Sequence, residues 1–328
     1  MLSFNDILGQ DGAKAHLLSA VSDGKVSHAY IFSGEDGSGK MMLAERFAAT
    51  LQCDNPSESG PCNMCINCMQ AETHNHPDIV YVTHSKKNIL VDDIRNQLIN
   101  DITIKPYSGR YKVYIIDEAE KMNEAAQNAL LKTLEEPPEY AVIILLSTNT
   151  GAFLQTILSR CVILDLKPVQ TYLIRDYLME NYHLPDYVAS LCASFACGCI
   201  GKAIRYATDE NFIKCRDLML KLVKAERSFL TADSAELIGF LGNKDHKDVI
   251  DDFFDLLDLW YRDVLVYKST HNDKRVIFSE ELSSVHTQAE HYSYEKLNKI
   301  LQAIEETKDR LIANVSLDAA IQLLIGAI

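Results

Sequence analysis

Long hydrophobic runs are missing from this sequence of 328 residues. The longest apolar run, Ala141–Leu146 (AVIILL), is far shorter than the roughly 20 residues that a helix needs to cross a bilayer. The N-terminus, MLSFNDILGQDGAK, has no basic start followed by an apolar core, so no export signal is predicted. We therefore expect a cytoplasmic protein with no membrane partner.

A surplus of positive charge is missing as well. Lysine and arginine total 32 against 46 aspartates and glutamates, which leaves a net charge of −14. Because a protein that binds DNA alone uses a basic surface to release counterions, this composition disfavours a self-sufficient DNA-binding protein. There is no internal repeat and no low-complexity tract. The length, with 47% hydrophobic and 24% charged residues, is typical of a globular protein of two or three domains.

The first half of the sequence alternates short apolar runs with helical patterns, as a parallel α/β sheet requires. The apolar runs are continuous, which is typical of strands that are covered on both faces. A clear helix lies between two of them, because Asn123 is placed to cap it and Pro137 and Pro138 end it. The five predicted strands are Ala29–Ser33, Asp78–Val82, Lys112–Asp117, Ala141–Ser147 and Val162–Leu166.

The β signal stops at Pro168, and the pattern is then helical nearly to the end of the sequence. Gly198 and Gly201 separate a short helical segment from a longer one. The longer part contains amphipathic stretches such as Asp248–Leu265, whose apolar residues recur at helical spacing. The second half therefore predicts a helical bundle.

A glycine-rich loop, GEDGSGKM, joins the first predicted strand to a helical pattern. In a phosphate-binding loop, backbone N–H groups surround the phosphates, the lysine reaches the terminal ones, and a following serine or threonine holds Mg²⁺. Here Met41 stands in that last place, and a thioether is a poor ligand for a hard cation. Phosphate contact by Gly34, Gly37, Gly39 and Lys40 is predicted, but magnesium-assisted hydrolysis is not. The alternative is a strand-to-helix turn with an incidental lysine.

Two acidic residues follow the third predicted strand. Asp117 and Glu118 lie where phosphate-loop proteins place an aspartate linked to the metal and a glutamate that activates water. The alternative is a pair of solvated acids at the end of a strand. The phosphate loop earlier in the chain favours the functional interpretation.

Four of the nine cysteines have the spacing C-x8-C-x2-C-x2-C. Thiolates this close predict a tetrahedral zinc site that is closed and therefore structural. The predicted ligands are Cys53, Cys62, Cys65 and Cys68. His74 and His76 compete with the distant first cysteine for the fourth place, although a turn expected at His76-Pro77 favours the cysteine. Small buried hydrophobic residues are expected at the other five positions, Cys161, Cys192, Cys197, Cys199 and Cys215.

Together these stretches resemble the clamp-loader branch of the AAA+ ATPases, as found in bacterial DNA polymerase III. The match runs in order over roughly the first half of the chain. It rests on FNDILGQ, SHAYIFSGEDGSGK, the cysteine spacing, HPDI, KVYIIDEAEKMNEAAQNALLKTLEEPP and TILSRC. The helical second half agrees in length and character but carries no distinctive motif.

The resemblance implies a layout of three domains. A RecA-like α/β domain at residues 1–167 would contain the zinc module at about 53–68, followed by a helical lid at 168–210 and a helical collar at 211–328. Such chains assemble through their collars into a hetero-pentamer with gamma/tau-type ATPase and delta-type subunits. The ring opens a sliding clamp and places it on primed DNA.

Within that family the chain resembles the stator type of subunit, which has little or no ATPase activity of its own. The resemblance implies that Arg160, in TILSRC, acts in trans as an arginine finger on a neighbouring subunit's nucleotide. Met41 agrees with this role, because it replaces the hydroxyl that an active subunit uses to hold Mg²⁺. Gly201 stands where active subunits carry a nucleotide-sensing arginine, although Arg205 lies one turn further.

Two other functions stay open from the sequence. An active gamma/tau-type ATPase subunit would need serine or threonine at position 41, where this chain has Met41. A zinc-bearing nucleic-acid-binding protein would need a basic face, which the net charge of −14 disfavours. Bound ATP or ADP remains compatible with the loop under the stator interpretation.

Overall fold

A computed structural model describes residues 2–84, 88–224, 230–243, 247–313 and 315–328. The chain folds into two compact units. We call them unit 1 (Met1–Ile174 with Gly198–Lys202) and unit 2 (Arg175–Cys197 with Ala203–Ile328). The layout of three domains stays a prediction.

Unit 1 contains a five-stranded sheet in the order β2-β3-β4-β1-β5, and every pairing is parallel. Two of the predicted strands have the expected bounds, and the other three are one residue shorter, because the apolar runs coincide with strands buried in the sheet. The observed strands are β1 (Ala29–Ser33), β2 (Ile79–Val82), β3 (Lys112–Ile116), β4 (Ala141–Ser147) and β5 (Val162–Asp165). The predicted α/β fold is therefore confirmed.

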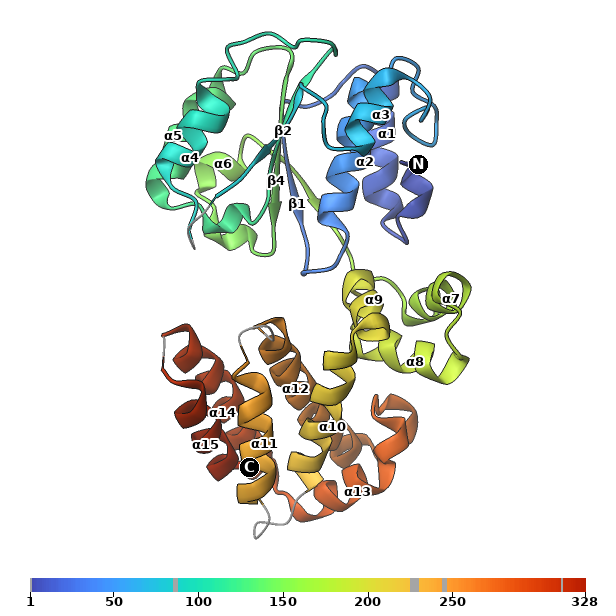
Figure 1. Cartoon of the computed structure of the whole chain (residues 1–328), viewed down its shortest axis with the longest axis vertical. Helices are drawn as coiled ribbons and strands as arrows, with labels where there is room; N and C mark the ends of the chain where they lie inside the picture. Colours follow the sequence, from blue (N-terminus) through green and yellow to red (C-terminus); the bar gives the residue numbers. More distant parts are fainter. Residues whose placement is uncertain (1, 85–87, 225–229, 244–246, 314) are drawn as a thin grey trace. The chain divides into compact units, whose positions relative to one another are not determined.

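Helices cover both faces of this sheet (Figure 1). Successive residues of β1 point to opposite faces, so Tyr30 and Phe32 enter one core and Ala29 and Ile31 the other. This explains why the strands read as continuous apolar runs. One face carries α1 (Asp11–Ser22), α2 (Lys40–Gln52) and α3 (Ile66–Glu72), and the other carries α4 (Val91–Ile94), α5 (Glu124–Glu135) and α6 (Gln155–Leu158).

The predicted capping of α5 is observed. The side chain of Asn123 accepts a hydrogen bond of 2.8 Å from the backbone N–H of Ala126. The helix ends at Glu135, two residues before the proline pair. Short single turns occur elsewhere in unit 1, at Phe4–Asp6, Arg95–Ile99, Ala119–Lys121 and Thr150–Ala152.

Because the strands are parallel, the sheet has two chemically distinct edges. The carboxyl edge is followed by the Gly34–Lys40 loop after β1 and by Asp117 after β3. Helix α2 starts at this edge and runs back to the amino edge, where it ends just before Cys53. Arg160 precedes β5 and therefore also lies at the amino edge.

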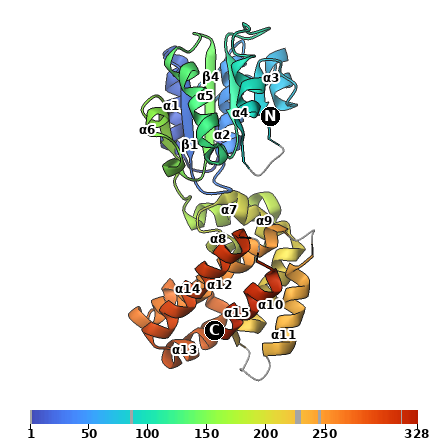
Figure 2. The ribbon, with the colours of Figure 1, turned by 90° about the vertical axis from the view of Figure 1, so that its left-hand side faces the viewer.

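Unit 2 is a helical bundle, as predicted. The long helix α12 supplies fully buried side chains, among them Trp260 and Tyr261, and it packs against α10, α13 and α14 (Figure 2). The helices of this part of the chain are α7 (Thr171–Tyr182), α8 (Asp186–Phe195), α9 (Ile200–Thr208), α10 (Glu210–Lys224), α11 (Leu230–Leu241), α12 (Lys247–Thr270), α13 (Leu282–His291), α14 (Tyr294–Ile312) and α15 (Leu317–Ala327), with short turns at Asp273–Arg275 and Ser279–Glu281.

A buried carboxylate on α12 binds the backbone of the segment that follows this helix. Asp263 accepts hydrogen bonds of 2.6 and 2.8 Å from the backbone N–H groups of Ile277 and Phe278, and its other oxygen pairs with Arg262. Burial raises its pKa, against these hydrogen bonds. The chain after α12 is thereby held against the helix.

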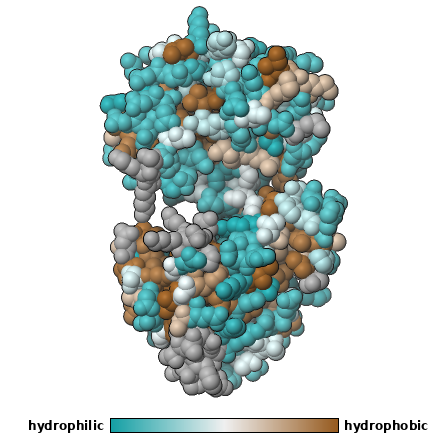
Figure 3. Space-filling view, viewed as in Figure 1, coloured by the Kyte–Doolittle hydropathy of each residue, from teal (hydrophilic) through white to brown (hydrophobic). Residues whose placement is uncertain are grey.

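The surface seen in Figure 3 is mostly hydrophilic, with hydrophobic atoms in scattered groups. Within the described ranges, no helix combines the length and the apolar character that a membrane crossing requires.

Candidate functional site

The Gly34–Lys40 loop has the backbone of a phosphate-binding turn. Gly37 and Gly39 have φ angles of 76° and 94°, in the left-handed region that favours glycine. The N–H of Gly34 donates to the carbonyl of Ser147, 3.1 Å away, so the loop is tied to the end of β4. Gly39 then caps α2, and the helix N-terminus points its N–H groups into the loop.

Lys40 is turned back onto its own loop. Its ammonium group donates to the carbonyls of Gly34 (2.6 Å) and Glu35 (3.0 Å), with the carboxylate of Asp36 at 3.6 Å. The Oγ of Ser38 is buried and has no hydrogen-bond partner among the described residues. The ammonium group that would meet a phosphate is therefore already hydrogen-bonded to oxygen atoms of its own loop.

Backbone from Gly198–Lys202 lies directly on this loop, within unit 1. The N–H of Gly201 donates to the carbonyl of Gly37 over 2.8 Å. A Cβ atom at Gly201 would come within 2.8 Å of the Gly37 Cα, and one at Gly37 within 2.9 Å of the Lys202 nitrogen. Both positions are thus restricted to glycine. The sequence marked Gly201 as a break between helical segments and as a place where an arginine is absent, and it did not predict this contact.

Met41 and Arg205 have other partners. The Met41 side chain packs against the core on the α2 face of the sheet. The guanidinium group of Arg205 is hydrogen-bonded to the buried Asp252 of α12, within unit 2. Each of these residues therefore has a structural contact of its own.

Asp117 and Glu118 follow β3 at the carboxyl edge. Glu118 has a φ of 49°, and its carboxylate lies 2.6 Å from the ammonium group of Lys121 and 3.4 Å from the ring of His84. The hydrogen bond from Lys121 is the main reason why the pKa of Glu118 is below its ordinary value. The backbone N–H of Glu118 donates to Asp117 at 2.9 Å. Both acids are engaged in local contacts.

A second polar pair at this edge was not predicted. Thr148, just after β4, donates from its hydroxyl to Glu120 over 2.8 Å. The other carboxylate oxygen of Glu120 is buried and unpartnered within the described part of the chain. The only sequence signal was the polar residue Thr148 directly after the apolar run of β4.

Arg160 lies on the opposite edge of the sheet. It donates to the carbonyl of Thr156 (2.9 Å), the hydroxyl of Ser159 (3.2 Å) and the carboxylate of Glu135 on α5 (2.9 Å). Its side chain is 34% exposed. The β5 strand that follows Arg160 runs from the amino edge to the carboxyl edge and spans about 13 Å at 3.3 Å per residue. The structure therefore does not bring Arg160 and the Gly34–Lys40 loop of the same chain together.

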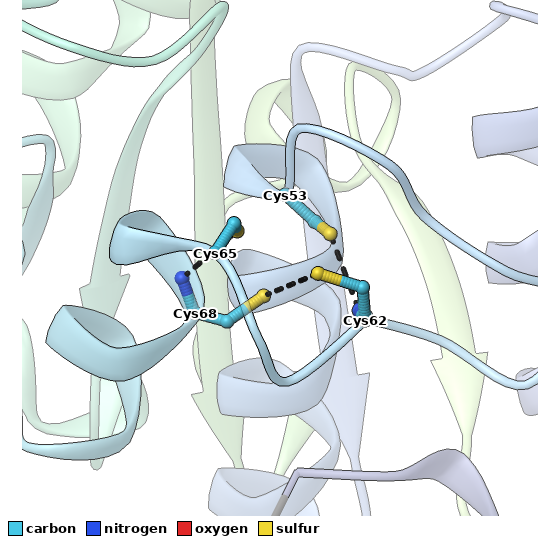
Figure 4. Close-up of side chains that lie close together, drawn as sticks. All are labelled: Cys53, Cys62, Cys65 and Cys68. Carbon is cyan, nitrogen blue, oxygen red and sulfur yellow. Dashed lines mark hydrogen bonds between the residues drawn. The ribbon is translucent and has the colours of Figure 1, made fainter.

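The four cysteines of the predicted zinc site converge (Figure 4). Their sulfur atoms all lie within 4.8 Å of one another, and those of Cys62 and Cys68 are 3.9 Å apart. A tetrahedral zinc ion with bonds of about 2.3 Å separates its sulfur ligands by about 3.8 Å, so the cluster fits this ion. Cys53 joins it from the end of α2, and Cys65 caps α3.

The competing histidines point elsewhere. His76 is buried, with one ring nitrogen accepting from the N–H of Asp78 at 3.1 Å and the other 3.3 Å from the amide oxygen of Asn67. His74 lies 3.0 Å from the hydroxyl of Tyr81. The fourth sulfur of the cluster is therefore that of Cys53.

The cysteine cluster is electrostatically uneven. The backbone N–H groups of Met64 and Cys65 lower the pKa of Cys62 to about 6, whereas burial raises the pKa values of Cys53 and Cys68. A thiolate at Cys62 and a metal that displaces the remaining protons are compatible with this arrangement.

Most of the remaining cysteines are small buried residues, as predicted. Cys192, Cys199 and Cys215 are buried, and Cys161 is partly buried. The prediction is wrong for Cys197, which is exposed because it turns the chain after α8 with a φ of 48°.

A parallel five-stranded sheet with a glycine-rich loop between β1 and α2 defines the chain as an α/β protein of the AAA+ class. A family model described as DNA polymerase III, delta subunit matches residues 9–170, and one described as DNA polymerase III, delta subunit, C terminal matches residues 210–325. DNA polymerase III subunit delta' of Bacillus subtilis is 30% identical over 317 residues, covering 94% of this chain and 93% of that protein. The chain belongs to this delta' family of clamp-loader proteins.

Other relatives are longer. DNA polymerase III subunit tau/gamma of Haemophilus influenzae is 38% identical over 203 residues, which are 60% of this chain and 29% of that protein. For subunit tau of Bacillus subtilis the identity is 30%, over 93% of this chain and 58% of that protein. The chain thus spans less than two thirds of either. A solved DNA polymerase III gamma subunit-related protein of Thermotoga maritima shares the fold, with a TM-score of 0.51, 20% identity and coverage of 94% of this chain and 97% of that chain.

Proposed function

We propose that the chain is the stator subunit of a DNA polymerase III clamp loader. It takes one place in a hetero-pentameric ring with gamma/tau-type ATPase and delta-type subunits, and the ring loads a sliding clamp on primed DNA. The chain itself does not hydrolyse nucleotide. It contributes Arg160 to the nucleotide site of a neighbouring subunit. Membership of the delta' family supports the assembly, and the geometry of unit 1 supports the division of labour.

The position of Arg160 carries this proposal. It lies at the amino edge of the sheet, whereas the loop of the same chain lies at the carboxyl edge. An arginine placed there can meet a γ-phosphate only when another chain holds the nucleotide. Its partner Glu135 is 51% exposed, and exposed ion pairs of this kind contribute about 0–1 kcal/mol, so the guanidinium group can exchange it for phosphate oxygens.

The carboxyl edge supports the absence of hydrolysis. Met41 packs against the core instead of offering an oxygen to Mg²⁺. Lys40 is bound by carbonyls of its own loop, and Gly37 is bound by Gly201. ATP or ADP binding would require Lys40 to leave two carbonyl oxygens. Asp117 and Glu118 then remain as acids without a metal to hold or a water to activate.

The four-cysteine cluster is a structural zinc site in this proposal. All four ligands are thiolates, so no coordination position is open for a reaction. The zinc ion would hold α3 against the end of α2.

Substitution of Arg160 tests the proposal in the reconstituted loader, with gamma/tau-type and delta-type subunits, clamp and primed DNA. We expect Arg160→Ala to preserve assembly of the ring. At the interface where Arg160 meets the neighbouring nucleotide site, it should lower DNA-stimulated ATP hydrolysis, and the clamp loading that depends on it, at least tenfold. An arginine finger raises the rate of hydrolysis at its own nucleotide site by a factor of about 10³–10⁵, and the other interfaces of the ring keep their fingers. Arg160→Lys should recover only part of the loss, because it lacks the planar fork of donors.

Arg95→Ala is the matched control, since Arg95 is an exposed arginine of the same unit. Loading at the wild-type rate by Arg160→Ala contradicts the finger role. Turnover of ATP by the purified chain alone, lost on Lys40→Ala, would identify a gamma/tau-type motor instead. Tight binding of DNA by the isolated chain would favour the zinc-bearing nucleic-acid-binding protein.

A further inference from the structure

The side chain of Arg160 is folded back onto the end of α6. Its Nη1 donates to the carbonyl of Thr156 at 2.9 Å and to the hydroxyl of Ser159 at 3.2 Å. A guanidinium group carries two hydrogens on each terminal nitrogen, so both hydrogens of Nη1 are used. Only the side of the group that holds Nη2 and Nε is left for a partner outside this segment.

A carboxylate of α5 takes that remaining side. The Nη2 of Arg160 lies 2.9 Å from Oε1 of Glu135. Arginine binds carboxylates and phosphates through the same planar fork of donors. A phosphate that approaches Arg160 therefore competes with Glu135 for the same nitrogen, and the negative charges of the two groups repel each other.

The backbone beneath this ion pair is fixed on both sides. Leu134, directly before Glu135, and Ile157 are buried in the same core. The N–H of Arg160 donates to the carbonyl of Ile157 over 3.0 Å. Helices α5 and α6 contact each other (Figure 1). The guanidinium group can therefore leave the carboxylate by rotation of side chains alone, without unfolding of either helix.

We propose that Glu135 is a positioning residue that acts through Arg160. It holds the finger away from the neighbouring subunit's nucleotide until the γ-phosphate displaces the carboxylate. This inference rests on the finger role proposed above and adds the regulation of the same site. Loss of the Glu135 charge should make the finger easier to recruit. Because both side chains of the pair are partly exposed, the gain should be at most about fivefold.

The test is a double-mutant cycle in the reconstituted loader, with clamp and primed DNA. DNA-stimulated ATP hydrolysis is measured with wild type, Glu135→Gln, Arg160→Ala and the double variant. We call the part of kcat/KM that Arg160→Ala removes the finger contribution, because the remaining rate belongs to the other interfaces. We expect the finger contribution to be about two to five times larger in the Glu135→Gln background. This gain should shrink at high ionic strength, because salt already weakens the ion pair of the wild type.

Glu136→Gln is the matched control. It removes the same charge one residue later, from a side chain that is also exposed, whereas the ion pair of Arg160 is with Glu135. The control should leave the finger contribution at the wild-type value. An equal gain in the control would show a general effect of charge and would overturn the positioning role.

Two further outcomes separate this inference from the proposed function. A finger contribution that is unchanged or smaller in Glu135→Gln, while Arg160→Ala still lowers hydrolysis, overturns the role of Glu135 and leaves the finger in place. If Arg160→Ala removes nothing in either background, the proposed function fails and this inference fails with it.

Discussion

The two edges of the sheet in unit 1 use their cationic side chains differently. At the carboxyl edge, Lys40 is buried and donates to two carbonyls of its own loop, and Gly201 closes over Gly37. At the amino edge, Arg160 is one-third exposed and pairs with the exposed Glu135. A buried cation that is satisfied by carbonyls of its own loop has little left to offer a ligand, whereas a cation held by a solvated partner can exchange that partner for a ligand.

Exchanging the present partners for a phosphate costs more free energy at Lys40 than at Arg160. Lys40 would have to leave two partly buried hydrogen bonds to carbonyl oxygens, each of about 1 kcal/mol or more because the donor is charged. Arg160 would leave an exposed ion pair of about 0–1 kcal/mol, and its bond to the Thr156 carbonyl uses a different nitrogen. This contrast supports the proposal that the amino edge, rather than the loop, meets a reacting nucleotide.

Loss of the metal site should have the largest effect, and only at the amino edge. Cys65→Ser is expected to abolish binding of about one zinc per chain and to unfold residues 53–72 locally. Structural zinc sites contribute about 10–16 kcal/mol of binding free energy in small peptides, but unit 1 also has its own core. Hydrogen exchange should show loss of protection in this segment while β1 and β4 stay protected.

Cys197→Ser is the matched control, because Cys197 is exposed and outside the cluster. Cys53→Ser should behave like Cys65→Ser, since no histidine takes its place in the structure. Full zinc content in the Cys53→Ser variant would show that the fourth ligand is another residue.

A buried carboxylate at the amino edge predicts a pH dependence of stability. Asp78 accepts hydrogen bonds from the backbone N–H groups of Tyr107, Ser108 and Gly109 at 2.6, 2.8 and 3.0 Å. Burial raises the pKa of Asp78, but these hydrogen bonds lower it by more, so the pKa lies below the ordinary 3.8. The stabilisation is therefore complete above about pH 4 and is lost as the pH falls through the folded-state pKa.

Asp78→Asn should lower the free energy of unfolding at pH 7 by about 1.5–3 kcal/mol, the range for hydrogen bonds to a charged group. The difference between variant and wild type should shrink on acidification, measured by urea unfolding from pH 7 down to pH 3. Asp36→Asn is the control, because Asp36 is exposed. A difference that stays constant with pH would mean that the Asp78 charge is not responsible.

At the carboxyl edge, Gly201→Ala should break the contact with the loop. The added methyl would lie 2.8 Å from the Gly37 Cα, and overpacking of this kind costs about 1–3 kcal/mol. Gly12→Ala is the control, because a Cβ there meets nothing within 4 Å and α1 gains a better helix former. Thermal unfolding should show a lower midpoint for Gly201→Ala and an equal or higher one for Gly12→Ala. Equal midpoints for the two variants would mean that the loop accommodates the methyl group.

Local patterns in the sequence predicted the strands, since buried apolar runs and strand bounds coincide to within one residue. They also predicted the cap at Asn123 and the gathering of the cysteines. The contact of Gly201 with Gly37 could not be predicted, because it joins backbone atoms far apart in the chain and leaves no trace in either local pattern. The same holds for Glu135 beside Arg160. The choice between Cys53 and a histidine depended on how the loop after α2 turns.

The smallest expected effect concerns Met41. Restoring a hydroxyl with Met41→Thr should leave ATP hydrolysis by the purified chain at background, because Lys40 stays bound to Gly34 and Gly201 still covers Gly37. The unfolding free energy should fall by about 1 kcal/mol or less, since the thioether packs only at the margin of the core. Met42→Thr, at the neighbouring and more exposed methionine of α2, is the control for stability and turnover. If Met41→Thr alone produced magnesium-dependent turnover, the contacts of Lys40 and Gly201 would be no barrier to nucleotide. The lack of hydrolysis at the carboxyl edge would then be explained by the missing Mg²⁺ ligand at position 41 alone.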